Sequence, residues 1–569
     1  MQGTAPHARR MVKPSTISSA ASGWDSEVRL LVWLATCICV LSFLFYYQRG
    51  EILLYGDAVA HINIARRVFD SKTPGPLQLG TVWLPLPHLL MTPFLISTQM
   101  WRRGAGGSIP SMVAYVFAVI GMFRLVRGTL SGNEQPDGAA RVAAWMAAFV
   151  YAANPNLIYM QTTAMGESVY LAFFIWAVVY FGESMRGDSK ALTRCGLCLA
   201  AACLTRYDGW FLAAGMTAAV IVLTFLSPEA ADAESRRQPT VILKFVLLAS
   251  AAPTLWLVYN GLVYRNPLEF ENGPYSAKAI ERKTQASGNP GHPGSGNPLL
   301  AGMYFVKSGE ANMAENAWLE RLWILIGFAA LVALALSLSS RQAATAGPRP
   351  SAMLPLFLLL APVPFYALSV AYGGVPIFVP AWWPFTHYNV RYGLQLLPAF
   401  AAFLACVVHF RMRSDRTKAT LRIATLMIAW ALVIASYATV WYAGPVSFAE
   451  AQINMGTRNQ LERQLAEWLK RLPPDSTILM YLGDHVGALE QAGIPLRRVI
   501  NEGNHRVWKQ PVDPDGLWER ALANPAEYAD YVVAFEGDPV WQAIEGFHRH
   551  ELVEIHVTGQ ARASLYSTR

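Results

Sequence analysis

The chain has 569 residues, of which 53% are hydrophobic and only 15% are charged, whereas a soluble domain carries about 25% charged residues. Apolar runs long enough to cross a bilayer recur along it, so composition excludes a soluble enzyme with one anchor and indicates a polytopic α-helical membrane protein. The net charge of +8 comes largely from short loops between these runs, which favours membrane orientation and anionic lipid as its cause. No zinc-finger, helix-turn-helix or RNA-binding pattern is present in the sequence, and no nucleic-acid partner is expected.

The chain begins with a polar stretch, residues 1–28, that predicts a disordered cytoplasmic tail. The first apolar run lacks a convincing small-residue cleavage site, so we expect a retained transmembrane helix rather than a signal peptide. About eleven transmembrane helices are predicted within residues 29–442, at 29–47, 110–127, 141–158, 167–182, 190–204, 209–226, 240–264, 319–339, 352–372, 393–410 and 420–442.

Basic residues support one orientation of these spans. With the N-terminus in the cytoplasm, every predicted inner loop is basic, as the positive-inside rule requires. This topology predicts a multi-pass protein of the cell (inner or plasma) membrane. It places the loops 48–109 and 265–318, and the residues 443–569, on the extracytoplasmic side.

Two outer segments interrupt the pattern of spans. Residues 81–97 are apolar but contain Pro85, Pro87 and Pro93, and a span here would place the later basic loops outside. We therefore expect an interfacial or re-entrant segment. The loop 265–318 has a centre rich in Gly, Pro and Ser, which is flexible by composition. It is interpreted either as a lid that orders on substrate binding or as a mobile connector.

The last region, residues 443–569, alternates short helical and strand patterns. Helices are expected at 460–472, 485–493 and near 516–523, and strands at 477–482, 498–500 and 531–535. This alternation predicts a small extracytoplasmic α/β domain. Scaffolding and acceptor recognition are the roles considered for it.

Acidic and imidazole side chains stand at the outer ends of several spans. Asp57 and His61 are four residues apart just after the first span, so on a helix they share a face. Glu167 opens the fourth span, where a carboxylate is also favoured by the helix dipole alone.

Basic side chains are predicted at the same outer face, namely Arg206, His387, Arg391, Lys278 and Arg282. Structural explanations exist for some of them, because Arg206 can simply pair with Asp208 and Arg391 can extend to lipid headgroups. Ionisable groups at one membrane depth are costly and tend to be functional. We therefore expect the acids and arginines to meet in one outer pocket.

The chemistry that suits this set is glycosyl transfer from a lipid phosphate. An acceptor hydroxyl is a weak nucleophile and needs a positioned carboxylate base. A departing polyprenyl phosphate carries negative charge that Arg, His or a divalent metal must stabilise. Arginine fits because its planar fork binds phosphate oxygens bidentately.

These residues resemble the integral-membrane glycosyltransferases of the C superfamily (GT-C), near the protein O-mannosyltransferases and the lipid A aminoarabinose transferases. The resemblance covers most of residues 30–442. It rests on Gly56-Asp57 after the first span, the Pro-rich segment with His88, Glu167, and Thr205-Arg206 before the sixth span.

The resemblance implies a polyprenyl-phosphate sugar donor, membrane lipids as surroundings, and inversion at the anomeric carbon with Asp57 as base. Glu167 and His61 are expected to complete the catalytic set, and the basic residues given above to bind the donor phosphate. Some relatives need a divalent metal, such as Mg or Mn, and others do not. Asp57, His61 and Glu167 are the candidates to hold one, although their spacing is not diagnostic.

The sequence also departs from the family. Relatives commonly have a Lys followed by Gly-Pro where this chain has Arg206-Tyr207-Asp208-Gly209. The sugar and the acceptor, whether protein, lipid or glycan, are therefore left open. A transporter or lipid flippase is the main alternative, but no internal repeat is found and the polar clusters lie at span ends rather than mid-span. A non-catalytic assembly factor would leave Asp57 and Arg206 without a task.

Overall fold

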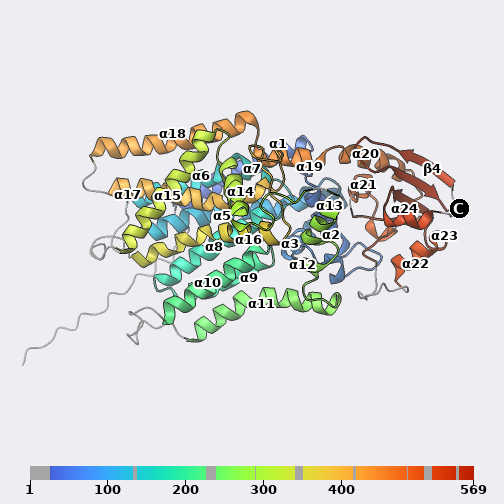
Figure 1. Cartoon of the computed structure of the whole chain (residues 1–569), viewed down its shortest axis with the longest axis horizontal. Coiled ribbons are helices and arrows are strands. Elements are labelled where there is room, and N and C mark those ends of the chain that lie inside the picture. Colours follow the sequence, from blue (N-terminus) through green and yellow to red (C-terminus); the bar gives the residue numbers. More distant parts are fainter. Residues whose placement is uncertain are drawn as a thin grey trace, which may run out of the picture.

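The computed structural model describes residues 26–131, 138–225, 239–286, 288, 290–339, 350–413, 418–483, 485–504, 516–545 and 550–568. Nearly all of the predicted N-terminal tail lies outside these residues. The described chain forms an elongated molecule, with a helical bundle at one end and a small sheet at the other (Figure 1). Helices α2, α3, α12 and α13 lie between the two parts.

The bundle contains a helix at every predicted span. These are α1 (Ser26–Gln48), α5 (Ala105–Leu130), α6 (Gly138–Ala152), α8 (Glu167–Met185), α9 (Ser189–Cys203), α10 (Asp208–Phe225), α11 (Pro239–Val263), α15 (Ala317–Ser339), η4 (Pro350–Leu360) with α16 (Pro362–Tyr372), η5 (Val390–Leu396) with α17 (Leu397–Arg413), and α18 (Ala419–Ala443). Among the described residues, eight helical segments are long and apolar enough to cross a membrane. The predicted number of eleven is therefore not confirmed, because α6, α9 and α10 fall short of that standard.

Outside the bundle, short helices build the layer in which the candidate site lies. They are α2 (Gly56–Arg67), η1 (Pro76–Leu79), α3 (Leu86–Leu95), α4 (Thr98–Arg102), α7 (Pro155–Met160), α12 (Glu269–Asn272), α13 (Ala277–Ala286), α14 (Pro298–Ala311) and α19 (Val446–Met455). The Pro-rich segment thus forms a helix of only 10 residues, shorter than the roughly 20 that a span requires. The loop 265–318 is largely helical, and α14 buries Tyr304 and Phe305 against the bundle.

The C-terminal region is a five-stranded mixed sheet with short helices. Its elements are α20 (Arg458–Leu469), β1 (Ile478–Met480), α21 (Gly487–Ala492), η6 (Leu496–Arg498), β2 (Val499–Ile500), α22 (Leu517–Ala523), α23 (Pro525–Tyr528), β3 (Tyr531–Phe535), α24 (Pro539–Ile544), β4 (His550–Ile555) and β5 (Ala563–Ser567). The strand order is β2-β1-β3-β5-β4. Strand β1 runs parallel to β2 and β3, whereas β5 is antiparallel to β3 and β4. The α/β fold class is confirmed, and the final hairpin is an element that the sequence prediction missed.

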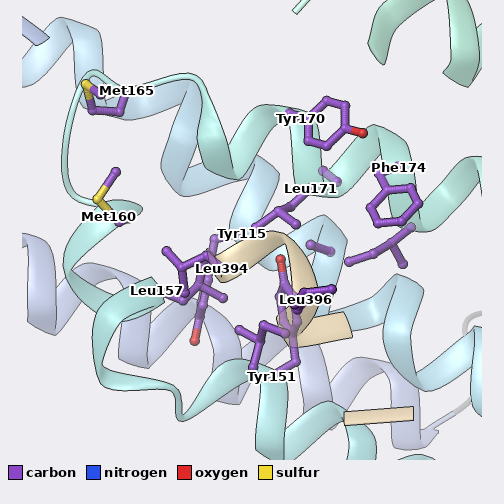
Figure 2. Close-up of a cluster of buried hydrophobic side chains, with 14 of the residues drawn as sticks. Tyr115, Tyr151, Leu157, Met160, Met165, Tyr170, Leu171, Phe174, Leu394 and Leu396 are labelled. Carbon is purple, nitrogen blue, oxygen red and sulfur yellow. The ribbon is translucent and has the colours of Figure 1, made fainter. Parts of the chain in front are cut away.

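The apolar core is continuous from the bundle into the sheet. Figure 2 shows part of it in the bundle, where Tyr115, Tyr170 and Leu394 come together from different elements. The hydroxyl of Tyr115 donates to the carbonyl of Ala152 at 2.7 Å, so even this buried polar group is satisfied. The same buried cluster includes Ile478 and other residues of β1, β2, β3 and β5. The sheet is therefore fixed on the bundle.

Candidate functional site

Asp57 lies in the first turn of α2, at the junction of the bundle and the C-terminal region. The amide of Gly56 donates to Asn454 Oδ1 at 2.7 Å. A Cβ at position 56 would lie 2.3 Å from Arg458 Nη1, so the guanidinium group of Arg458 packs directly against this glycine. The Asp57 side chain is 42% exposed, which leaves one face of the carboxylate open to a ligand.

Arg391 connects this aspartate to two buried acids. Its Nη2 donates to Asp57 Oδ2 at 2.9 Å and its Nε to Glu167 Oε1 at 3.2 Å. Its Nη1 donates to one oxygen of Glu450, and its backbone amide donates to the other at 3.1 Å. Asn389, which adopts the left-handed conformation with φ 54°, precedes this turn of chain. The guanidinium is thus held in one orientation by three carboxylates.

Arg206 is the second arginine of the network. It donates to Glu167 Oε1 at 3.1 Å, to Asp208 Oδ2 at 3.3 Å and to the Tyr366 hydroxyl at 2.9 Å. Its guanidinium lies 4.7 Å from the ring centroid of Tyr392, and that of Arg391 lies 5.0 Å from the same centroid. Glu167 is therefore shared by both arginines, and Tyr392 contacts both through cation–π interactions.

A neutral side chain completes the network at the bundle side. The amide nitrogen of Gln395 donates to Asp208 Oδ2 and, at 2.8 Å, to the Tyr366 hydroxyl. Tyr366 in turn donates to Asp208 Oδ2 at 3.2 Å. Four carboxylates and two guanidinium groups thus form one connected set, consisting of Asp57, Glu167, Asp208, Glu450, Arg206 and Arg391.

His61 lies near this set but has different partners. Its Nδ1 is 2.8 Å from His88 Nε2, and its ring packs against Trp83 with the centroids 5.0 Å apart. Burial lowers the pKa of His61, which favours the neutral imidazole. His61 therefore contacts His88 and Trp83, and its catalytic role stays a prediction.

The remaining predicted phosphate ligands have no contact with the network among the described residues. Lys278 faces Glu271 at 3.7 Å, and Arg282 is exposed on α13. His387 is partly buried in the loop before η5, and burial lowers its pKa. Within the described part of the chain, no group of three or more His, Cys, Asp and Glu side chains is arranged to hold a metal ion. The candidate metal set with His61 is thus not assembled.

A cavity of about 640 Å³ opens on the other side of Asp57. Helix α2, the first outer loop, the segment 263–280 and the C-terminal region contribute to its wall. Glu167, Arg206 and Arg391 are not part of this wall. Asp57 therefore stands between the acid–arginine network and an open cavity.

With this arrangement established, known proteins offer a comparison. No family model and no curated protein sequence matches the chain. Solved structures, in contrast, do match the chain. The chain is similar in fold to ArnT.

The ArnT from Cupriavidus metallidurans bound to undecaprenyl phosphate matches with a TM-score of 0.53 at 11% identity, over 95% of this chain and 98% of that chain. The same ArnT in the apo state has a TM-score of 0.46 at 12% identity, over 95% and 98% of the two chains. An oligosaccharyltransferase from Archaeoglobus fulgidus, tethered with an acceptor peptide, has a TM-score of 0.48 at 14% identity, over 95% and 74%. The match to the lipid-bound ArnT confirms the predicted polytopic helical membrane fold with a C-terminal α/β region, and at 11% identity it concerns the fold alone.

Several network residues were not predicted from the sequence. Gln395 and Tyr366 are polar groups inside apolar segments, and that position is a signal that could have identified them. Glu450 follows the last predicted span without any motif. Its role depends on α19 packing beside α7 and η5, which no local pattern indicates.

Proposed function

We propose that the protein is a membrane glycosyltransferase that moves a sugar from a polyprenyl-phosphate donor to an acceptor hydroxyl on the extracytoplasmic side. Asp57 acts as the general base, and a direct displacement inverts the anomeric carbon. The observation that carries this proposal is the exposure of one carboxylate. The side chain of Asp57 is 42% exposed, whereas those of Glu167, Asp208 and Glu450 are at most 3% exposed.

The geometry assigns different tasks to the charged groups. Only Asp57 among these four acids can meet an incoming hydroxyl. Arg391, held by three carboxylates, orients Asp57. Arg206 is the more accessible guanidinium, with 19% of its side chain exposed against 6% for Arg391. Arg206 therefore contacts the donor phosphate, and Glu167 positions both arginines.

The fold supports a lipid-linked donor. ArnT, whose structure holds undecaprenyl phosphate, shares this architecture over nearly the whole chain. A polyprenyl tail also explains why the acid–arginine network is placed at the ends of apolar helices. We place the protein in the cell membrane, with its N-terminus in the cytoplasm and the C-terminal region outside.

The test is the replacement of Asp57 by asparagine in the full-length protein. Asp57→Asn keeps the size and one acceptor oxygen but removes the base, so the rate of sugar transfer should fall by about 10²–10⁴-fold. Transfer is measured with a radiolabelled polyprenyl-phosphate sugar, and donor binding is measured in parallel.

Asp188→Asn is the matched control, because Asp188 lies at the far end of α9 and either residue can cap that helix. The control should transfer sugar at the wild-type rate. Wild-type turnover by Asp57→Asn would remove the base assignment. Uptake of lipid without any transfer by the unmodified protein would instead favour a flippase.

A further inference from the structure

The cavity beside Asp57 has a wall whose chemistry is informative about the acceptor. Its volume of about 640 Å³ lies within the roughly 300–1,000 Å³ of sites that enclose a small molecule. Because Asp57 belongs to the wall, a hydroxyl group bound in the cavity lies on the open side of the proposed base. The argument that follows rests on the proposed function.

Aromatic rings from three separate segments line the cavity. Trp83 comes from the first outer loop, Tyr264 and Tyr275 from the chain after α11, and Tyr481 from the chain after β1. Trp83 is supported from behind by the buried His61. Such rings offer flat apolar faces with a polar rim, which suit the C–H faces of sugar rings.

Two polar side chains of the wall each have one buried atom without a hydrogen-bond partner. Arg67 Nε and Gln78 Oε1 are buried and have no hydrogen-bond partner among the described residues, and both side chains line the cavity. Gln78 is only 3% exposed. The lining also contains the guanidinium group of Arg67 as a donor and the carboxyl groups of Glu269 and Glu502 as acceptors, so a ligand that supplies both donors and acceptors would match this wall. Sugar hydroxyls do both.

The charges of the wall argue against an anionic ligand. The described lining carries four carboxyl groups and two guanidinium groups, namely Asp57, Glu269, Glu462, Glu502, Arg67 and Arg458. Burial raises the pKa of Glu462 to about 7, which still leaves no excess of positive charge. Glu502 already acts electrostatically on Arg67. A phosphorylated or carboxylated acceptor would meet carboxylates that the arginines do not outnumber.

We propose that the acceptor is a neutral carbohydrate, whose terminal sugar is stacked on Trp83 and Tyr481 and hydrogen-bonded by Arg67 and Glu502. The base Asp57 removes the proton of one of its hydroxyls as that oxygen forms the new bond to the donor's anomeric carbon. The polyprenyl phosphate leaves with the electrons of the broken bond. Phosphorylated saccharides and peptides are the competing classes.

Binding of saccharides to the full-length protein in lipid nanodiscs tests this assignment. The probes are an array of neutral oligosaccharides of both anomeric linkages, phosphorylated glucosamine disaccharides, and a peptide rich in Ser and Thr. Saturation-transfer NMR and calorimetry should detect a neutral saccharide and neither of the other classes. Undecaprenyl phosphate is titrated into the same samples.

Two substitutions and a control locate the bound saccharide. Tyr481→Ala and Glu502→Gln should each weaken saccharide binding by about tenfold, the effect of one lost charged hydrogen bond or ring contact. Glu502→Gln keeps the oxygen that accepts from the amide of Leu482, so the local fold is maintained. Glu467→Gln is the matched control on the exposed face of α20 and should bind as the unmodified protein does.

Two results would overturn the assignment. One is binding of the phosphorylated saccharide or the peptide in place of neutral saccharides. The other is a protein that binds undecaprenyl phosphate but none of the neutral array. If the unmodified protein did not bind undecaprenyl phosphate, that result would count against the proposed function instead. The saccharide titration would still decide which class of ligand the cavity binds.

Discussion

At the scale of single residues, the hydrogen-bonded ion pairs between acids and arginines determine the geometry of the site. Asp57 and Glu167 were predictable, because acids at the outer ends of membrane helices are rare and costly. The pairing of both arginines with Glu167 was not predictable, because residues 167, 206 and 391 are far apart in the sequence. Glu450 carries no local signal at all. The sequence therefore predicted the chemical groups better than their connections.

Arg391→Lys tests the orienting role of this guanidinium. Lysine keeps the charge but cannot reach Asp57, Glu167 and Glu450 in a fixed plane. Losing even one charge-assisted hydrogen bond corresponds to about 1.5–3 kcal/mol, so we expect a transfer rate at least about tenfold lower and a reduced melting temperature.

Arg49→Lys is the control for Arg391→Lys. Arg49 is 56% exposed and pairs with Glu51, and such surface pairs contribute at most about 1 kcal/mol. Its transfer rate and melting temperature should therefore stay close to those of the unmodified protein. Equal behaviour of the two variants, by kinetic assay and thermal unfolding, would contradict the role given to Arg391.

At the scale of elements, backbone contacts set the positions of the site residues. Long apolar runs located every helix of the bundle, because about 20 apolar residues can satisfy their backbone in lipid only as a helix. They did not show that α14 packs on η5, since the contact is made through Gly393 and the carbonyl group of Ser308. Short polar loops and glycines leave little pattern in the sequence, although they determine where Arg391 lies.

Gly393→Ala should disturb this contact. A Cβ there would lie 2.3 Å from the backbone carbon and oxygen of Ser308, and backbone cannot move aside as a side chain can. We expect a loss of about 1–3 kcal/mol in unfolding free energy. Arg391, two residues earlier, should be displaced as well, with a corresponding loss of transfer. Thermal unfolding and the transfer assay measure both effects.

Gly215→Ala is the matched change for Gly393→Ala. Gly215 lies in α10, and a Cβ there would meet no heavy atom within 4 Å. Because alanine favours helix over glycine by about 1 kcal/mol, this variant should be as stable as the unmodified protein or slightly more stable. A Gly393→Ala protein that matched it would show that the approach of α14 and η5 has room to relax.

At the scale of the whole molecule, buried acids lie where the C-terminal region meets the first outer loop. Glu490 on α21 accepts a hydrogen bond from Asn63 of α2 at 3.0 Å, and Glu462 lies nearby on α20, with Arg458 Nε 3.8 Å from its carboxylate. Burial raises the pKa of Glu490 well above its usual value and that of Glu462 to about 7. Sequence reasoning predicted the two regions but not this contact between them.

These acids should make stability depend on pH. A carboxyl whose pKa is raised on folding holds its proton more tightly in the native state, so its contribution is complete below about pH 4.5 and is lost as the pH rises through 7. At about 1.4 kcal/mol per pKa unit, Glu462 accounts for on the order of 3 kcal/mol over this range. The melting temperature should therefore fall between pH 5 and pH 8.

Glu462→Gln should flatten this profile, because the amide does not ionise. Glu467→Gln on the same helix should leave the slope unchanged, since Glu467 is exposed and pairs with Lys470. Differential scanning calorimetry across the pH range measures both. A slope unaffected by Glu462→Gln would assign the pH dependence to other groups.

The continuous core has a consequence for how the protein can be dissected. Ile478 and Leu565 belong to the same buried cluster as the bundle residues Tyr115 and Phe174. Cutting the chain after α18 would bare apolar surface on both fragments, so neither should remain soluble and native alone. Transferring the sheet to another helical bundle would require redesigning the apolar contact between sheet and bundle as well. The sheet and the bundle therefore form one structural unit that has to be kept intact in any truncated or redesigned protein.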